Sequence, residues 1–450
     1  MLKLTQMLFQ SEQKGSYGDY YERALYNHIL SSQRPQGGFV YFTPMRPNHY
    51  RVYSQVDHGM WCCVGSGIES HAKYGEFIYA HEKDTLFVNL FVASTLNWKE
   101  KGVRITQATS FPDADTTRLT VDGDGTFTMK IRYPAWVAPG RMEVKVNGKA
   151  VKLDAQPGSY ASVERRWKKG DRVDVRLPMT THLEQMPGKS NYYAVLHGPV
   201  VLAAKTRMLG DEKLNYLADD SRMGHIASGP MCPLESAPML VSDSTDFLAR
   251  FKPVAGKPLT FTAPGLVHGA DGPRTEFIPF FRLHESRYTM YWQHSTPGSL
   301  KELQAANAAR EADRIALDAL TIDAVAPGEQ QPESDHFFKG EGSEAGINNG
   351  RHWRHAAKWF SYELNDPKGE ARVLRLTFAK ADAGRRFDVL VNGKVLAEVT
   401  LDANAKEDIY TVDYPIPEAM RQAAKGKLSV RFEARPDSVA GGLYGLRLLR

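Results

Sequence analysis

Two adjacent cysteines, Cys62 and Cys63, are the residues of this sequence best suited to chemistry. They are two of only three cysteines in the chain. The stretch Ser66-Gly67-Ile68-Glu69 follows them and has the Ser-x-x-Glu form of a capping box, which predicts a helix there. Thiols just before a helix N-terminus face the positive end of the helix dipole, which favours the thiolate. A thiolate is both a metal ligand and a nucleophile. The alternative is that both side chains are small, buried apolar filler, because free cysteine is among the most buried residue types.

Metal binding at this pair would need further ligands. A structural zinc ion takes about four N, S or O ligands, and a catalytic one about three with an open position. The sequence has no second Cys-x-x-Cys motif and no His-x-x-x-His motif, so no complete zinc site is encoded locally. The nearest candidate ligands are His58, Glu22 and His28. For each of them the alternative is an ordinary surface or core position.

Carboxylates near the cysteines could serve glycoside hydrolysis, which uses a general acid and a nucleophile or base. The candidates are Glu22, Asp57, Glu69 and Glu76. Glu69 is expected to serve its own helix cap and Glu76 to be solvated. Glu22 is the strongest candidate, because it shares a predicted helix with Tyr21 and Asn27 that could line a pocket. Its alternative is an ion pair with a neighbouring arginine.

Two later stretches are rich in polar and aromatic residues. They are Glu333-Ser334-Asp335-His336-Phe337-Phe338 and His352-Trp353-Arg354-His355. They could close over a sugar, because tryptophan stacks on sugar faces and His and Arg bind hydroxyls. Simple packing between domains is the alternative that we favour. The sequence has no phosphate-binding glycine loop, no Gly-x-Ser-x-Gly and no dinucleotide fingerprint.

The pattern of apolar residues predicts a helical first part and two β-rich parts. Residues 1–83 are predicted to be mainly helical, with a helix after a cap at Ser16–Asp19 and a short strand at Phe39–Phe42. Short alternating strands and the Asn147-Gly148 turn predict an antiparallel β-sandwich over 84–205.

The remaining residues divide into a mixed region and a second sandwich. Residues 206–326 are predicted to be a mixed accessory region that ends in a solvated helix from Ser299 to about Leu320. Residues 327–350 are predicted to be a linker or an ordered loop. A second β-sandwich with an Asn392-Gly393 turn is predicted within 327–450.

Composition narrows the classes of partner. The chain of 450 residues is long enough for about two to four domains. Its formal net charge is +5, without a basic block, so nucleic acid is not expected as a partner. No apolar run approaches the length of a membrane span. The first residues lack the small-residue cleavage site of a signal peptide.

Several motifs together resemble the β-L-arabinofuranosidase-like glycoside hydrolases of families 127 and 146. They are Tyr20-Tyr21-Glu22-Arg23-Ala24-Leu25-Tyr26-Asn27, Cys62-Cys63, Leu86-Phe87-Val88-Asn89-Leu90-Phe91, Ile131-Arg132-Tyr133-Pro134-Ala135-Trp136, Val146-Asn147-Gly148, Trp167-Lys168-Lys169-Gly170-Asp171 and His197-Gly198-Pro199-Val200. The resemblance covers about residues 1–205, and the remainder is similar to accessory β-domains of some bacterial members.

The resemblance implies an α + β multidomain fold, with part of an (α/α)6 catalytic barrel followed by antiparallel β-sandwich domains. It implies a retaining mechanism in which Cys62 is the nucleophile, Cys62 and Cys63 bind Zn²⁺, and Glu22 is a second catalytic residue. His58 and Trp61 would contact the substrate, a plant-type oligo- or polysaccharide that releases β-L-arabinofuranose. It further implies a periplasmic or secreted location for the full-length enzyme.

The resemblance also implies that a Glu-x-Cys pair of zinc ligands and the general acid/base lie just upstream of Met1. The chain is therefore expected to begin inside a barrel helix and to hold an incomplete site. Leu2, Leu4, Met7 and Leu8 are then expected on an open helical face. The alternatives to an enzyme are a non-catalytic carbohydrate-binding β-sandwich protein and an inactive gene fragment.

Overall fold

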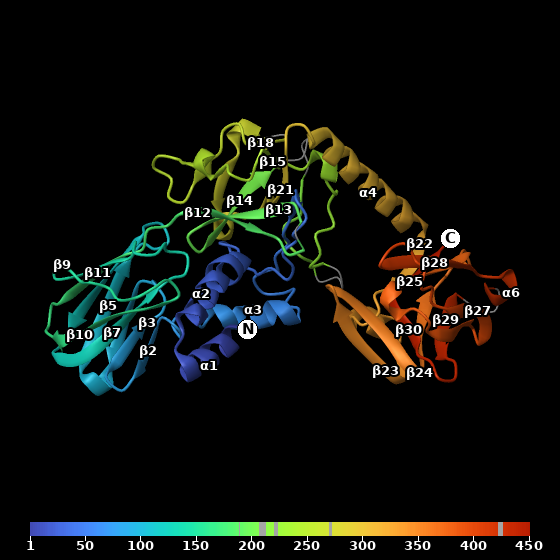
Figure 1. The fold of residues 1–450 in the computed structure, drawn as a ribbon, viewed down its shortest axis with the longest axis horizontal. Coiled ribbons are helices and arrows are strands. Elements are labelled where there is room, and N and C mark those ends of the chain that lie inside the picture. Colours follow the sequence, from blue (N-terminus) through green and yellow to red (C-terminus); the bar gives the residue numbers. More distant parts are fainter. Residues whose placement is uncertain (189, 207–212, 220–223, 270–271, 422–425) are drawn as a thin grey trace. The chain divides into compact units, whose positions relative to one another are not determined.

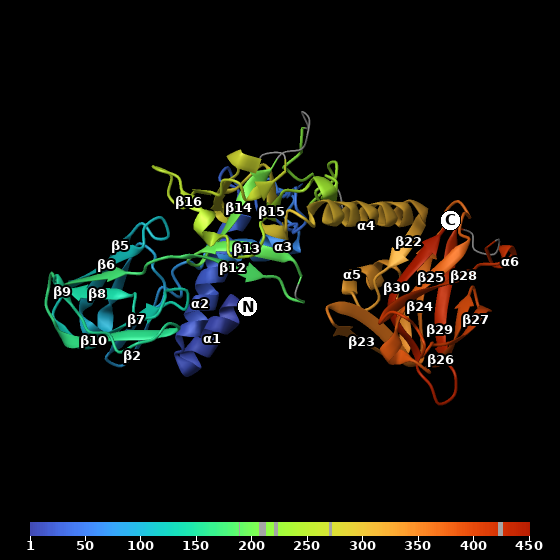
Figure 2. The same ribbon diagram turned by 45° about the horizontal axis from the view of Figure 1, so that its top comes forward.

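The protein is described by a computed structural model of residues 1–450, except Lys189, 207–212, 220–223, 270–271 and 422–425. Two compact units make up the chain, Met1–Ala308 and Ala309–Arg450, and each is described by itself. The described part is mostly β-structure with a few helices (Figures 1 and 2). Within it, no helix is both long enough and apolar enough to cross a membrane.

The first unit begins with three helices rather than a continuous helical region. They are α1 (Leu2–Glu12), α2 (Gly15–Ala24), which continues as a π-helical turn (Leu25–Leu30), and α3 (Cys62–His71). Residues 33–61 contain no helix. The predicted strand at 39–42 is reduced to isolated bridges, Gln33 with Phe39 and Val40 with Tyr53. Three helices do not establish the expected partial (α/α)6 barrel, which stays a prediction.

Helices α1 and α2 bury one side against a shared apolar cluster that includes Phe9, Tyr21, Leu25, Phe77 and Phe87. The side chains of Leu4, Met7 and Leu8 on α1 are exposed, as predicted, whereas Leu2 is partly buried. Helix α2 starts at Gly15 and not after the predicted cap at 16–19.

The start of α3 corrects the predicted capping box. The helix begins at Cys62, with Trp61 as its N-cap, so Ser66 lies inside the helix. The Ser66 hydroxyl donates to the Cys63 carbonyl (3.3 Å), and Glu69 pairs with Lys3 and Lys73 instead of closing a cap. The tertiary packing of Trp61, which the local sequence does not report, sets the helix start. The two thiols are therefore in the first turn of the helix and not in front of it.

A β-sandwich follows, with two sheets around one core (Figure 1). One sheet contains β2 (Tyr79–Glu82), β3 (Thr85–Val88), β7 (Gly125–Tyr133) and β10 (Ser159–Trp167). The other contains β4 (Ser94–Trp98), β5 (Val103–Thr109), β6 (Thr116–Asp122), β8 (Glu143–Val146), β9 (Lys149–Ala150) and β11 (Arg172–Arg176). Strands β3 and β7 pair in parallel, so the sandwich is not purely antiparallel as predicted. The Asn147-Gly148 hairpin is confirmed, since both residues have positive φ (50° and 80°) between β8 and β9.

Residues 181–206 belong to a separate sheet and not to the predicted sandwich over 84–205. This sheet contains β1 (His49–Tyr50), β12 (Thr181–Gln185), β13 (Tyr192–His197), β14 (Val200–Thr206), β15 (Met239–Val241), β16 (Lys252–Pro253), β17 (Phe261–Thr262), β18 (Val267–His268), β19 (Glu276–Pro279), β20 (Arg287–Thr289) and β21 (Tyr291–Ser295). Strand β13 pairs with β21, and β14 pairs with β19 and β20. The aromatic run after Phe277 therefore forms strands that pair with β13 and β14, which places these two strands in a sheet outside the sandwich.

Helix α4 (Leu300–Leu320) agrees with the predicted helix, and the second unit continues from it as one curved sheet. Its strands are β22 (Thr321–Val325), β23 (Lys339–Asn348), β24 (Arg351–Asn365), β25 (Val373–Ala379), β26 (Arg386–Val391), β27 (Lys394–Thr400), β28 (Ile409–Pro415), β29 (Lys427–Ala434) and β30 (Ala440–Leu449), with short helices α5 (Gln330–Asp335) and α6 (Glu418–Arg421). All nine strands are linked by pairing around one core, rather than as two separate sheets. The Asn392-Gly393 turn is confirmed between β26 and β27. Residues 327–350 are not a linker, because they form α5 and β23.

Candidate active site at the cysteine pair

Both thiols of the first turn of α3 are accessible. Cys62 and Cys63 are exposed, and their Sγ atoms lie 3.8 Å apart. The alternative of buried apolar filler is therefore wrong for this pair, although it describes the buried Cys232. The first amides of a helix have no intrahelical acceptor, so the partial positive charge there favours a thiolate.

A tyrosine hydroxyl sits against the first thiol. Tyr41 Oη lies 3.5 Å from Cys62 Sγ. Hydrogen bonding by Tyr41, and next by Cys63, lowers the pKa of the Cys62 thiol. The same interaction raises the pKa of Tyr41. When the sulfur is ionised, only the tyrosine hydroxyl can donate in this contact. Sequence reasoning missed Tyr41, because nothing in its local pattern links it to the cysteines.

Backbone pairing with residues 53 and 54 places Tyr41. Phe39 N donates to Ser54 Oγ (3.0 Å), and Ser54 N donates to the Phe39 carbonyl (2.8 Å). A Cβ on Gly38 would collide with the Ser54 carbonyl, so this close approach requires glycine. The chain then continues directly into Tyr41.

An aromatic cluster surrounds the tyrosine. The Tyr41 ring contacts Phe42 (4.6 Å between centroids), Trp61 (6.5 Å) and His225 (4.5 Å). Trp61, predicted to contact substrate, is thus beside the thiols. His225 comes from a distant part of the chain, and no sequence signal pointed to it.

The other residues near Cys62 in sequence do not join it. His58 Nδ1 lies 2.7 Å from Asp57 Oδ1 on the surface, and this hydrogen bond lowers the pKa of Asp57. His28 is exposed. Lys3, and next Lys73, lower the pKa of Glu69 to about 2. Glu76 faces Lys73 at 3.9 Å. No contact with either thiol is found for His58, Asp57, His28, Glu69 or Glu76 in the described structure.

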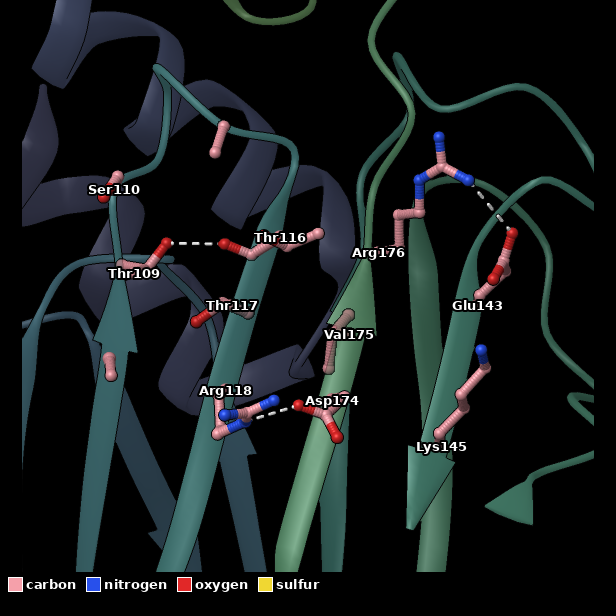
Figure 3. A pocket seen from close by; sticks show the side chains of 12 residues that line it. Thr109, Ser110, Thr116, Thr117, Arg118, Glu143, Lys145, Asp174, Val175 and Arg176 are labelled. Carbon is pink, nitrogen blue, oxygen red and sulfur yellow. Dashed lines mark hydrogen bonds and ion pairs between the residues drawn. The ribbon is translucent and has the colours of Figure 1, made fainter. Parts of the chain in front are cut away.

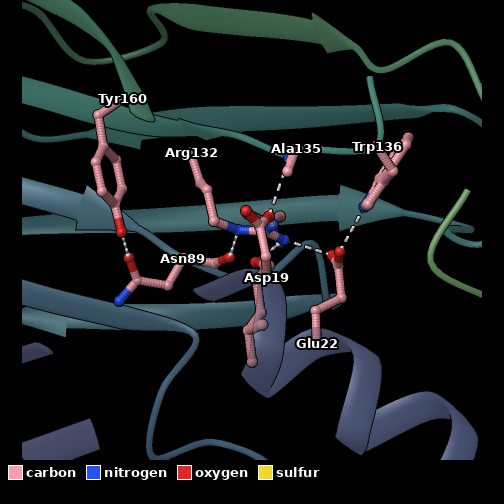
Figure 4. A network of polar contacts seen from close by, with 9 residues as sticks. Asp19, Glu22, Asn89, Arg132, Ala135, Trp136 and Tyr160 are labelled. Atoms are coloured by element: carbon pink, nitrogen blue, oxygen red, sulfur yellow. Dashed lines mark hydrogen bonds and ion pairs between the residues drawn. The ribbon is translucent and has the colours of Figure 1, made fainter. Parts of the chain in front are cut away.

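Glu22 is buried in a polar network between α2 and the sandwich (Figure 4). Arg132 Nη2 donates to Glu22 Oε1 (2.5 Å), and Trp136 Nε1 donates to Glu22 Oε2 (2.9 Å). Burial raises the pKa of the Glu22 carboxyl, while Arg132 and Trp136 oppose that effect. Both carboxylate oxygens of Glu22 therefore accept hydrogen bonds, and the contact with Arg132 is the ion pair with an arginine that the sequence offered as the alternative.

The loops suspected of closing over a sugar make contacts inside the second unit. Arg354 Nη2 and Tyr362 Oη donate to the Glu333 carboxylate (2.6 and 2.8 Å). His336 Nε2 lies 3.0 Å from Asp323 Oδ1. The Trp353 and His355 rings lie 4.7 Å apart. Packing explains these residues.

A polar groove of about 800 Å³ lies elsewhere, on the outer face of β5, β6, β8 and β11 (Figure 3). Most of its charged groups are already paired: Arg118 Nε with Asp174 (2.6 Å) and Arg176 with Asp115 (3.1 Å) and Glu143 (3.5 Å). None of the predicted site residues lines it. We therefore do not assign the chemistry to this groove.

The side chains available as metal ligands test whether the expected zinc ion could bind here. Zn²⁺ binds three or four N, S or O donors at one point. Among the residues that the structure describes, no group of three or more His, Cys, Asp or Glu side chains could hold a metal ion. Cys62 and Cys63 offer two sulfur donors, so the described residues do not form a complete zinc site.

Four family models match successive parts of the chain. Residues 1–76 match the GH127 β-L-arabinofuranosidase catalytic domain, and residues 85–179 match the middle domain of the same family. Residues 182–294 match a domain of unknown function, and residues 316–449 match a family of unknown function.

Individual proteins are similar to parts of this chain. A non-reducing end β-L-arabinofuranosidase from Bifidobacterium longum is 25% identical over 249 residues, which are 50% of this chain and 37% of that protein. The GH127 β-L-arabinofuranosidase from Geobacillus stearothermophilus T6 is 24% identical, with a TM-score of 0.47 over 65% of this chain and 48% of that one. Another GH127 β-arabinofuranosidase is 22% identical, with a TM-score of 0.48 over 66% and 49%. The chain thus spans about half or less of each relative's length.

Proposed function

Residues 1–179 are those of a GH127 β-L-arabinofuranosidase-like protein, and on this premise we propose that the chain is part of a glycoside hydrolase that releases β-L-arabinofuranose from plant-type glycans. One observation carries the proposal. The exposed Cys62, with its thiol pKa lowered by Tyr41, lies within the part that matches the catalytic domain. A thiol in such an environment is activated as a nucleophile.

The chemistry proposed for Cys62 is a double displacement. The Cys62 thiolate attacks the anomeric carbon, forming a C–S bond as the glycosidic C–O bond breaks, and the leaving oxygen takes up a proton. Water then displaces the sulfur, so the sugar leaves with retained configuration and the thiolate is restored. Tyr41 donates to the sulfur before attack and again when it departs. Trp61 and the rings around it offer apolar surface to a sugar face.

Two parts of the expected machinery have no assigned residue in the described structure. The proton donor to the leaving group is one, because Glu22 is held by Arg132 and Trp136. The zinc ion is the other, because only two sulfur donors are brought together. No step above depends on the metal. The extracytoplasmic location and the glycan substrate are parts of the same proposal and rest on the resemblance.

Turnover of p-nitrophenyl β-L-arabinofuranoside tests the proposal. We expect Cys62→Ser to abolish turnover, because the hydroxyl of serine is not ionised at neutral pH. Gly67→Ala, on the same helix where no atom lies within 4 Å of the new Cβ, should retain it. Equal turnover in wild type and Cys62→Ser would contradict the role of the thiol. Sugar binding without any turnover would instead support a non-catalytic carbohydrate-binding protein.

A further inference from the structure

His225 is brought to the cysteine site by a segment that is far from it in sequence. Tyr216, Ala218 and Gly229 of this segment are hydrogen-bonded to the stretch that precedes α3. The contacts are Tyr53 N to Tyr216 O (2.9 Å), Ala218 N to Tyr53 O (2.8 Å) and Gly229 N to Tyr50 Oη (2.7 Å). Tyr50, Val52 and Ala218 form a buried cluster there, against which Trp61 packs. The position of His225 is therefore part of the fold of the first unit.

Ring packing, rather than hydrogen bonding, holds the imidazole. Its centroid lies 4.5 Å from that of Tyr41, 4.8 Å from Trp61 and 5.5 Å from Phe42. Its Nδ1 atom is buried and has no hydrogen-bond partner among the residues that the structure describes. A Cβ on the preceding Gly224 would collide with the Asp219 carbonyl, so the backbone beside the histidine is tightly placed. Burial lowers the pKa of His225, so the ring is neutral near pH 7 and does not act on the thiols through charge.

The Tyr41 hydroxyl depends on this packing. The hydroxyl lies 3.5 Å from Cys62 Sγ and also interacts with Cys63. Contacts at the hydroxyl alone do not fix the rotamer of a tyrosine ring, so the neighbouring rings determine where it lies. Phe42 is itself exposed, which leaves His225 and Trp61 as the more firmly placed neighbours.

We propose that His225 is a positioning residue of the cysteine site: its ring holds Tyr41 where the tyrosine hydroxyl reaches Cys62 Sγ. The inference rests on the proposed role of Cys62 as the reacting thiol. It gives a role to a segment within 182–294, which matches only a domain of unknown function. The site is then built from two separate stretches of the chain.

Alkylation of Cys62 by iodoacetamide tests the inference without substrate. We would use the full chain with Cys63→Ser, in EDTA, so that Cys62 is the one exposed cysteine. Tyr41→Phe removes the hydroxyl that contacts the sulfur, and His225→Ala removes the ring that holds this hydroxyl in place, so both variants lose the same activating contact. We expect each to slow alkylation by roughly threefold. His225→Phe, which keeps a ring, should restore the rate.

A double variant separates positioning from a general structural effect. If His225 acts through Tyr41, His225→Ala adds no further loss in a Tyr41→Phe chain. His268→Ala, an exposed histidine within 182–294, is the matched control and should not change the rate. His225→Asn replaces His225→Ala if the latter does not fold. An unchanged rate in the ring-deleting variant, failure of His225→Phe to restore it, or additive losses in the double variant would overturn the inference.

Different results would refute the proposed hydrolase and the proposed positioning role of His225. Coupling of His225 to Cys62 alkylation in a chain without turnover would refute the proposed hydrolase but support the positioning role. Turnover that depends on Cys62, with alkylation indifferent to His225, would refute the positioning role alone.

Discussion

Arg132 on β7 is fully buried and bonds to groups from two other parts of the first unit (Figure 4). Its guanidinium pairs with Asp19 and Glu22 of α2, and its Nε donates to the Asn89 carbonyl (2.6 Å). A Cβ on Gly18 would collide with the Arg132 side chain, so α2 approaches β7 this closely only because residue 18 is glycine. This one residue joins the helical part to the sandwich.

Replacement of Arg132 by methionine should destabilise the first unit strongly. We expect a loss of about 3–5 kcal/mol in the free energy of unfolding, since two carboxylates lose their buried partner. The loss should shrink at lower pH, where protonation removes the uncompensated charge. Urea unfolding at pH 5 and pH 8 measures both effects. Arg118→Met, which breaks an exposed pair with Asp174, is the control and should cost about 0–1 kcal/mol. Equal losses in the two variants would contradict the prediction.

For single residues, the sequence identifies the reactive side chains better than it identifies the residues that surround them in the fold. Cys62 and Cys63 were identified because adjacent thiols near a helix start are a local pattern. Tyr41 and His225 were not, because their contacts with the site depend on how distant segments pair. Glu22 shows the same limit, since its partner Arg132 lies 110 residues away.

Helices and turns that depend on a few adjacent residues were predicted with little error. Both Asn-Gly hairpins are found, because only residues that tolerate positive φ fit such a turn. Helix α4 starts at Leu300, next to the predicted Ser299. Elements fixed by packing were misplaced: α3 begins at Cys62, and 181–206 pairs with β19, β20 and β21 instead of the sandwich. Sheet membership depends on partners that alternation alone does not specify.

The hydrogen bond between His336, which directly follows α5, and Asp323 on β22 should make the stability of the second unit depend on pH. The hydrogen bond to Asp323 raises the pKa of His336, because it favours the imidazolium. The protonated pair therefore stabilises fully below about pH 6.5, the unfolded value, and its contribution is lost as the pH rises through the raised folded pKa.

A histidine variant measures this effect. We expect the difference in unfolding free energy between wild type and His336→Asn to be largest near pH 6 and to narrow by pH 9. Denaturant titrations of the second-unit transition give this difference. His352→Asn, at a half-buried histidine on β24, is the matched control for removal of a histidine from the second unit. A difference independent of pH would refute the assignment to His336.

The two compact units have separate buried cores. Leu119 is fully buried in the sandwich, and Leu376 is fully buried in the second unit. Since the two units cluster separately, we expect two transitions in calorimetry.

Matched leucine variants test this independence. Leu119→Ala and Leu376→Ala should each cost about 2–5 kcal/mol, from lost burial and the cavity left behind. Each should lower the midpoint of one transition and leave the other unchanged. A single transition that moves in both variants would show that the units unfold together.

The long separation between Glu22 and Arg132 bears on the order of events during synthesis. With 110 residues between them, translation at about 5–20 residues per second delivers the arginine roughly 5–20 s after the glutamate. Through that interval α2 carries carboxylates with no counterion, so it cannot settle into a dry interface. The segment that holds His225 leaves the ribosome later still. The thiols of α3 are therefore made after Tyr41 and Trp61 but before His225, so a chain that stalls between these points presents Tyr41 and Cys62 without the ring that completes the cluster.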